Sequence, residues 1–96
     1  MRIRNVVHKG LRRFIEKDDR SGLLPAAVEK IGNIVSFLQE MNDVEEVRSM
    51  PSWRAHIMAG NRKGSWSLTV TRNWRITFRI DAAENEIADL DFEDYH

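Results

Sequence analysis

Three runs of alternating apolar and polar residues near the C-terminal end constrain the fold of this chain more than any other feature. They read SWSLTVT at 65–71, WRITFRI at 74–80 and EIADLDFE at 86–93. Alternation with a period of two is typical of strands that bury one face. Because only short turns at 72–73 and 81–85 separate the runs, we expect successive strands to pair antiparallel.

The alternation also predicts which side chains face the core. The inward set is Trp66, Leu68, Val70, Trp74, Ile76, Phe78, Ile80, Ala88, Leu90 and Phe92. Arg75, Thr77 and Arg79 then point outward from the middle strand. The dipeptide at 72–73 predicts a two-residue hairpin, in which Asn73 takes a left-handed conformation.

The first half of the chain has helical periodicity instead. KGLRRFIEK at 9–17 places apolar residues at helical spacing, and Gly22 is expected to end this helix. Pro25 suits the first turn of a second helix, in which Gly32 costs about 1 kcal/mol relative to alanine. The apolar stripe of that helix comprises Val28, Ile31, Val35, Leu38 and Met41.

Three shorter segments complete the prediction. RIRNVV at 2–7 and WRAHIM at 53–58 are expected to be strands, and Asp43 with Glu46 predicts a capping box for a short extra turn. The sheet then has about four strands in a meander. Residues 1–96 therefore predict one α+β domain, with N-terminal helices packed on one face of an antiparallel β-sheet.

Composition excludes several classes of protein. The chain has 96 residues and no cysteine, which suits a single domain and excludes disulfides and thiolate zinc sites. The longest apolar stretch, LLPAAV, is too short to span a bilayer, and the start, MRIRNVV, lacks the apolar core of a signal peptide. We expect a soluble cytoplasmic protein without a cofactor, a metal site or a membrane partner.

Charge is distributed unevenly although the net charge is zero. The segment 48–80 has seven basic residues and no acidic one, whereas 81–96 has seven acidic residues and no basic one. Such asymmetry is typical of a polyanion partner for the basic part. The alternative is that basic and acidic strands simply pair across one sheet.

The chain ends in DFEDYH, so its last three residues can each hold or move a proton. Chain ends usually fray, but the strand pattern through 93 places Asp94, Tyr95 and His96 at the end of a paired strand. His56 lies on another expected strand within the basic segment, while His8 is expected to be ordinary surface.

This set of residues suits acid–base cleavage of RNA. Such cleavage needs a base for the 2′-hydroxyl proton, an acid for the leaving 5′-oxygen and cations for the phosphate. Histidine can serve as either acid or base. The alternative reading is structural: a lone histidine on a strand, a tyrosine packed against the core and solubilising edge charges.

The segment HIMAGNRKGSWSLTVTRNWRITFRI, the terminal EDYH and the N-terminal HKGLRRFIEKDDRSG resemble the HigB toxins of the RelE/ParE superfamily. The resemblance covers nearly the whole chain and implies a RelE-like, microbial-RNase-like fold. It implies a ribosome-dependent mRNA endonuclease of a type II toxin–antitoxin system. The implied partners are a HigA-like helix-turn-helix antitoxin, the A site of the 70S ribosome with its mRNA, and operator DNA only through the antitoxin complex.

The resemblance also implies site residues. The family's catalytic residues match His56, Arg75, Asp94, Tyr95 and His96. RNA-binding cations are expected at Arg54, Arg62, Lys63 and Arg72.

One position departs from the family pattern. Relatives commonly read His-Pro-Leu-Lys-Gly where this chain reads HIMAG, so Ala59 replaces a lysine. Arg62, Lys63 or Arg75 is expected to compensate, or cleavage is slower. The rival hypotheses are a binding module of the same fold that acts on a protein, as ParE-type members do on DNA gyrase, and an inactive repressor subunit.

Overall fold

The alternating runs pair as neighbouring strands of one five-stranded sheet with the order β1-β5-β4-β3-β2. The computed structural model describes residues 1–94 of the chain. Strand pairing is antiparallel throughout the segment β2 to β5, which confirms the expected meander. The strands are β1 (Arg2–Ile3), β2 (His56–Ile57), β3 (Trp66–Thr69), β4 (Trp74–Asp81) and β5 (Glu86–Asp94).

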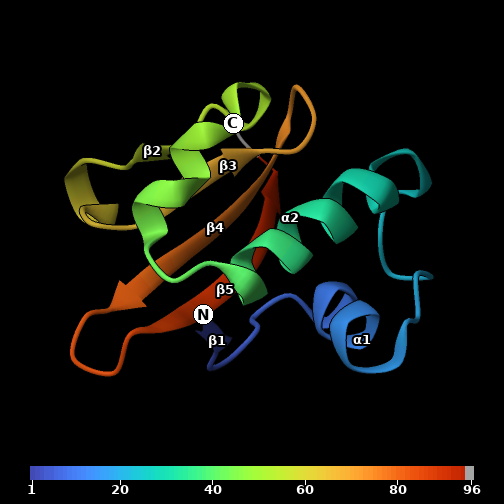
Figure 1. Cartoon of the computed structure of the whole chain (residues 1–96). Helices are drawn as coiled ribbons and strands as arrows, with labels where there is room; N and C mark the ends of the chain where they lie inside the picture. The colour runs from blue at the N-terminus through green and yellow to red at the C-terminus, as the bar shows by residue number, and fades with distance from the viewer. Residues whose placement is uncertain (95–96) are drawn as a thin grey trace.

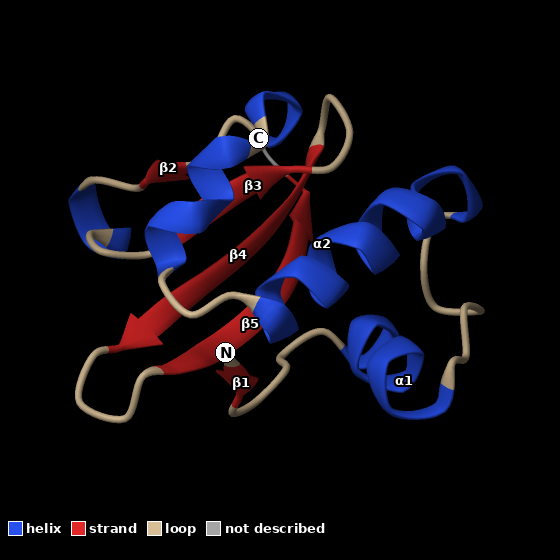
Figure 2. Ribbon diagram, in the orientation of Figure 1, coloured by secondary structure: helices blue, strands red, loops and turns tan. Residues whose placement is uncertain are grey.

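Both α-helices and the helical turns within residues 44–53 lie over one face of this sheet (Figures 1 and 2). The α-helices are α1 (Lys9–Lys17) and α2 (Val28–Glu40), and the 3₁₀ turns are η1 (Pro25–Ala27), η2 (Val44–Ser49), η3 (Pro51–Trp53) and η4 (Gly60–Arg62). The buried face of α2 packs with the inward residues of the sheet to form one core. The predicted α+β architecture, with helices on a sheet, is therefore confirmed.

The first strand is shorter than expected and adds a parallel pair to the sheet. Only Arg2–Ile3 forms a strand, and it pairs in parallel with β5. The Arg4 guanidinium donates hydrogen bonds to the carboxylates of Glu86 on β5 and Asp81 on β4. Arg4 therefore attaches the N-terminal segment to these two strands. The prediction of a purely antiparallel sheet is corrected at this position.

The 53–58 strand is also shorter than predicted. Pro51 begins the turn η3, which includes Trp53, and Arg54 takes a left-handed conformation at the end of that turn. Regular pairing with β3 is therefore confined to His56–Ile57.

Three turn predictions have different outcomes. The capping box is confirmed, because Asp43 N–H donates to the Glu46 carboxylate at 2.9 Å. Helix α1 ends earlier than Gly22, at a left-handed Asp18. The left-handed asparagine is Asn85 rather than Asn73.

The hairpin between β3 and β4 is wider than two residues. Trp74 N–H donates to the hydroxyl of Thr71 at 3.2 Å, while the Arg75 guanidinium donates to the Thr71 carbonyl at 2.9 Å. These hydrogen bonds stabilise a loop that is longer than the predicted two-residue turn.

A β-bulge changes the inward set on β5. The strand register with β4 shifts next to Asp89, which has a positive φ of 55°. An extra residue in one strand moves the side chains before it to the opposite face of the sheet. Ile87 therefore pairs with the inward Ile80, and Ala88 pairs with the outward Arg79. The prediction that Ala88 shares a face with Leu90 and Phe92 is wrong.

Two glycines bring α1 and the following loop into backbone contact. A Cβ built on Gly10 would lie 2.3 Å from the Gly22 carbonyl oxygen. Backbone atoms cannot rotate away as a side-chain tip can, so this contact tolerates no larger residue. Gly32 in α2 differs, because its nearest neighbour would be the Phe14 ring at 3.6 Å.

We expect Gly10→Ala to destabilise the protein by about 2 kcal/mol, since overpacking outweighs the better helix propensity of alanine. Gly32→Ala, the same chemical change in a helix with room, should stabilise by roughly 0.5–1 kcal/mol. Urea unfolding of both variants measures the two differences. Equal effects of the two substitutions would contradict the importance of the Gly10–Gly22 contact.

Candidate active site

The face of the sheet opposite α2 carries a row of polar side chains across four strands. His56 of β2 pairs with Ser67 of β3, Ser67 pairs with Thr77 of β4, and Thr77 pairs with Asp91 of β5. Direct cross-strand partners lie on the same face, about 5 Å apart. One row of the strand register therefore places His56 in line with two hydroxyl groups and a carboxyl group.

A cavity of about 200 Å³ is formed on this face. Four of the residues predicted from the sequence line it: His56, Arg62, Arg75 and Asp94. The remaining lining residues are Met58, Ser67, Thr77 and Glu93. A histidine, two arginines and carboxylates from segments far apart in sequence thus share one cavity.

The ring of His56 is exposed and held by one contact to the backbone. Its Nδ1 lies 3.1 Å from the Arg54 carbonyl oxygen. Because a carbonyl only accepts, Nδ1 carries the proton in this contact. In the neutral ring Nε2 then has the free lone pair, and this nitrogen can accept a proton from a bound molecule.

Arg62 reaches the cavity from η4 and forms a forked ion pair with Glu93. Its Nη1 and Nη2 donate to the two carboxylate oxygens at 2.9 and 2.6 Å. Glu93 also accepts a hydrogen bond from the Thr77 hydroxyl. The bond from Arg62 holds the pKa of Glu93 below its ordinary value, with a smaller contribution from Thr77.

Asp91 differs from Glu93 although both lie on β5. Burial raises the pKa of Asp91 above its ordinary value, and the nearby Glu93 charge adds to this effect. Its carboxylate accepts the backbone N–H of Phe92 at 2.9 Å. On the outer face, the surroundings therefore favour the charged form of Glu93 and disfavour the charged form of Asp91.

Arg75 lies on the outward side of β4, as predicted. Its Nη1 donates to the carbonyls of Thr71, Arg72 and Trp74 at 2.9–3.3 Å. The loop before β4 therefore fixes the direction of this guanidinium beside the cavity.

The other predicted RNA-binding residues lie outside the cavity. Arg54, Lys63 and Arg72 are exposed and make no ion pair with another residue of 1–94. Tyr95 and His96 lie outside the described residues. Ala59, at the position of the family lysine, is exposed at the start of η4.

Ser67, Glu93 and Met58 were missed by the sequence reasoning. Ser67 lies between the inward residues Trp66 and Leu68, so the alternation predicts that it points outward. The pairing of Arg62 with Glu93 spans 31 residues and has no local signal. His8 is also more than ordinary surface, because its Nδ1 accepts the Leu11 N–H at 3.0 Å and caps α1.

The structure shows basic–acidic pairing for part of the basic segment, and the pair Arg79 of β4 with Asp89 of β5 joins two strands. Arg62 pairs with Glu93, and Arg79 pairs with Asp89 at 2.7 Å. Arg48 instead pairs with Glu45 and lies over the Trp66 ring. Pairing thus explains these three cations, whereas Arg54, Lys63 and Arg72 remain on the surface.

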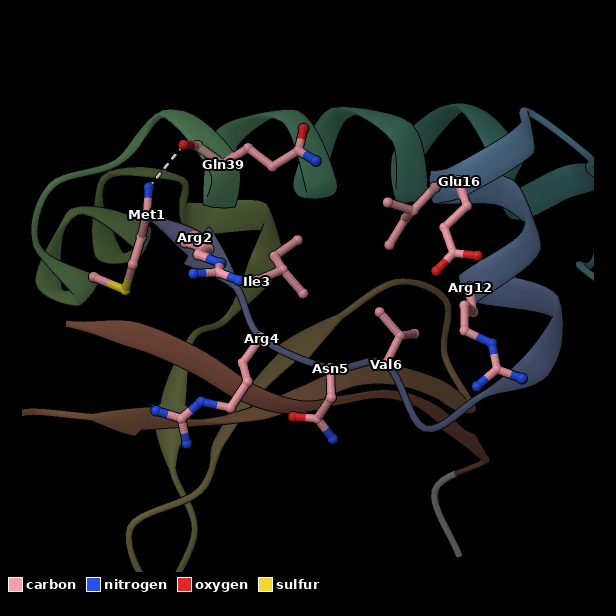
Figure 3. Close-up of a pocket in the computed structure, with 10 residues that line it drawn as sticks. Met1, Arg2, Ile3, Arg4, Asn5, Val6, Arg12, Glu16 and Gln39 are labelled. Atoms are coloured by element: carbon pink, nitrogen blue, oxygen red, sulfur yellow. Dashed lines mark hydrogen bonds between the residues drawn. The ribbon is translucent and has the colours of Figure 1, made fainter. Parts of the chain in front are cut away.

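A larger concavity of about 720 Å³ lies elsewhere, along β1 and the adjoining parts of α1 and α2 (Figure 3). Arg4, Asn5, Arg12 and Glu16 line it. Within it the α-amino group of Met1 donates to carbonyls at the end of α2, including that of Gln39 at 2.7 Å. None of the predicted site residues lines this concavity.

Two negative findings apply to residues 1–94. No group of three or more histidine, aspartate or glutamate side chains is placed to hold a metal ion. None of the helices in this part is long and apolar enough to cross a membrane.

Comparison with known proteins identifies the family. The family model described as the RelE-like toxin of type II toxin–antitoxin system HigB matches residues 4–96. Endoribonuclease HigB of Proteus vulgaris is 34% identical over 94 residues, which cover 98% of this chain and 99% of that protein.

A solved structure shows the same fold. The YoeB/ParE toxin from Agrobacterium tumefaciens superposes with a TM-score of 0.53 at 16% identity, covering 100% of this chain and 99% of that one. With the near-complete match to the family model, the chain belongs to the HigB-like toxin family, the RelE-like toxins of type II toxin–antitoxin systems.

Proposed function

We propose that this toxin is an endoribonuclease that cleaves mRNA on the translating ribosome. The observation that carries the proposal is the cavity in which His56 lies with Arg62, Arg75 and Asp94. The printed name of the Proteus vulgaris relative, Endoribonuclease HigB, supports the same activity.

The proposed reaction is an internal transfer of the phosphodiester. The 2′-oxygen attacks phosphorus, the P–O5′ bond breaks, and a 2′,3′-cyclic phosphate forms and is hydrolysed to a 3′-phosphate. His56 takes the 2′-hydroxyl proton at Nε2, since its Nδ1 proton is engaged with the Arg54 carbonyl. His96 then gives a proton to the leaving 5′-oxygen. No metal ion is required, because the substrate supplies its own nucleophile.

The remaining residues would hold the substrate. Arg75, oriented by three carbonyls, would stabilise the charge that develops on the phosphate oxygens. Asp94 would orient a histidine, and Tyr95 would contact a base or the 2′-hydroxyl, because single-stranded bases stack on aromatic rings. Arg62 and Arg75 would compensate for the lysine absent at Ala59, since both line the cavity.

The exposed cations would contact RNA outside the cavity. Arg54, Lys63 and Arg72 make no ion pair with another described residue and would bind phosphates of mRNA or of ribosomal RNA. We further propose that the toxin acts in the cytoplasm, in the A site of the 70S ribosome. A HigA-like helix-turn-helix antitoxin would neutralise it, and operator DNA would be bound only through that complex.

Induction of the wild-type protein is expected to produce new 5′ ends within translated mRNAs. In a pre-formed ribosome complex, cleavage should survive EDTA, because the 2′-hydroxyl needs no metal-activated water. Mapping of mRNA 5′ ends before and after induction measures the effect. Unchanged 5′-end maps would contradict the nuclease, and trapped gyrase–DNA complexes would instead favour a gyrase-directed toxin.

A further inference from the structure

We propose that Glu93 occupies the position of an RNA phosphate on Arg62, and that substrate binding exchanges the carboxylate for a phosphodiester. The inference deepens the proposed function and relies on it only for the identity of the polyanion as RNA. Arg62 and Glu93 line the same cavity as His56 and Asp94. Glu93 would then regulate access of RNA to the site.

The geometry of the ion pair matches that of a phosphate contact. Both Nη atoms of Arg62 donate to separate oxygens of Glu93, at 2.9 and 2.6 Å. Arginine binds carboxylate and phosphate by the same two-oxygen fork. The carboxylate therefore fills the site on Arg62 that the non-bridging oxygens of a phosphodiester would fill.

The exchange leaves neither partner isolated. The side chain of Arg62 is 50% exposed and that of Glu93 is 29% exposed, so water can solvate both charged groups when the pair separates. Glu93 would keep its hydrogen bond from Thr77 after Arg62 leaves. A released carboxylate therefore retains a partner within the sheet.

An unexchanged carboxylate would oppose substrate binding. Glu93 is a negative charge in a cavity proposed to receive phosphate, and like charges repel. While paired, it also neutralises Arg62, one of the two arginines that line the cavity. The repulsion acts with or without Arg62, whereas the neutralisation requires Arg62. Removing the carboxyl charge should therefore strengthen RNA binding more when Arg62 is present than when it is absent.

The test is a double-mutant cycle on RNA affinity. Glu93→Gln keeps the shape of the side chain and removes the charge. We expect it to tighten binding of a 2′-O-methyl oligoribonucleotide about fivefold, the upper range for an exposed ion pair. In the Arg62→Ala background the same substitution should change affinity less than twofold. Fluorescence anisotropy at low ionic strength keeps the weaker variants measurable, because phosphate contacts strengthen at low salt.

Asp91→Asn is the matched control for loss of one negative charge on the same strand. Asp91 lies on the same face but makes no hydrogen bond to Arg62 within the described residues. We expect its effect to be smaller than that of Glu93→Gln. Circular dichroism and thermal unfolding establish that each variant is folded.

Several results would overturn the exchange. They are an unchanged affinity in Glu93→Gln, an undiminished gain in the Arg62→Ala background, an equal gain in Asp91→Asn, or no saturable binding by folded wild-type protein. Because the oligonucleotide cannot be cleaved, failure of the nuclease reaction does not affect this measurement. The two proposals can therefore fail separately.

Discussion

Replacing His56 by alanine is expected to slow mRNA cleavage about a hundredfold or more, as the loss of a positioned acid–base group does. This corresponds to a barrier raised by about 2.7 kcal/mol. His56 is exposed, and within residues 1–94 its ring has one hydrogen bond, from Nδ1 to the Arg54 carbonyl, so we expect stability to change by less than about 0.5 kcal/mol. Single-turnover cleavage of mRNA in programmed ribosomes measures the rate.

His8→Asn is the matched control for His56→Ala. Asparagine is a good N-cap and can replace the contact that His8 makes to the Leu11 N–H. Because His8 does not line the cavity, this variant should cleave at the wild-type rate. Full activity in His56→Ala would show that the histidine on β2 is structural.

The sheet was predictable because side-chain alternation has the same period as the strand. Residues 65–71 and 74–80 alternate, 86–93 alternates except at Ile87, and each run contains a strand in the expected order. The bulge at Asp89 was not predictable in this way, because a single left-handed residue leaves no periodic signal. It exchanges the places of Ile87 and Ala88 while leaving the rest of the pattern intact.

Turn chemistry explains the smaller errors. Asparagine adopts the left-handed conformation more readily than most residues. Of Asn73 and Asn85, only Asn85 adopts it. The loop before β4 is stabilised instead by two hydrogen bonds to Thr71, one from the Trp74 N–H and one from the Arg75 guanidinium. Local propensity could not show that a side chain of the following strand would bind the loop carbonyls.

The candidate site was partly predictable for a different reason. The resemblance supplied His56, Arg75 and Asp94, and the strand register then placed them around one cavity. Glu93 was visible only as part of an acidic segment. Its partner Arg62 is 31 residues away on η4, so their pairing depends on where the loop between β2 and β3 places Arg62.

The terminal histidine provides the other large expected effect. Asp94 is the last residue of β5, pairs with Trp74 and lines the cavity with His56. His96 follows Asp94 by two positions in the sequence, and the proposed function assigns it the proton for the leaving 5′-oxygen. If His96 protonates the leaving 5′-oxygen, neither of the other two histidines is available for that role, because His56 is the proposed base and His8 caps α1.

We therefore expect His96→Ala to slow cleavage about a hundredfold or more and to abolish growth arrest. The domain should still fold and bind its antitoxin, since position 96 follows the last strand pair, Trp74 with Asp94. Tyr95→Phe tests the neighbouring position: it keeps the aromatic ring, so a contact made by stacking should survive while a contact through the hydroxyl should not. Single-turnover cleavage, circular dichroism and antitoxin pull-down separate a lost proton donor from a lost fold. A folded His96→Ala protein with wild-type cleavage would contradict this role and assign the acid to another group.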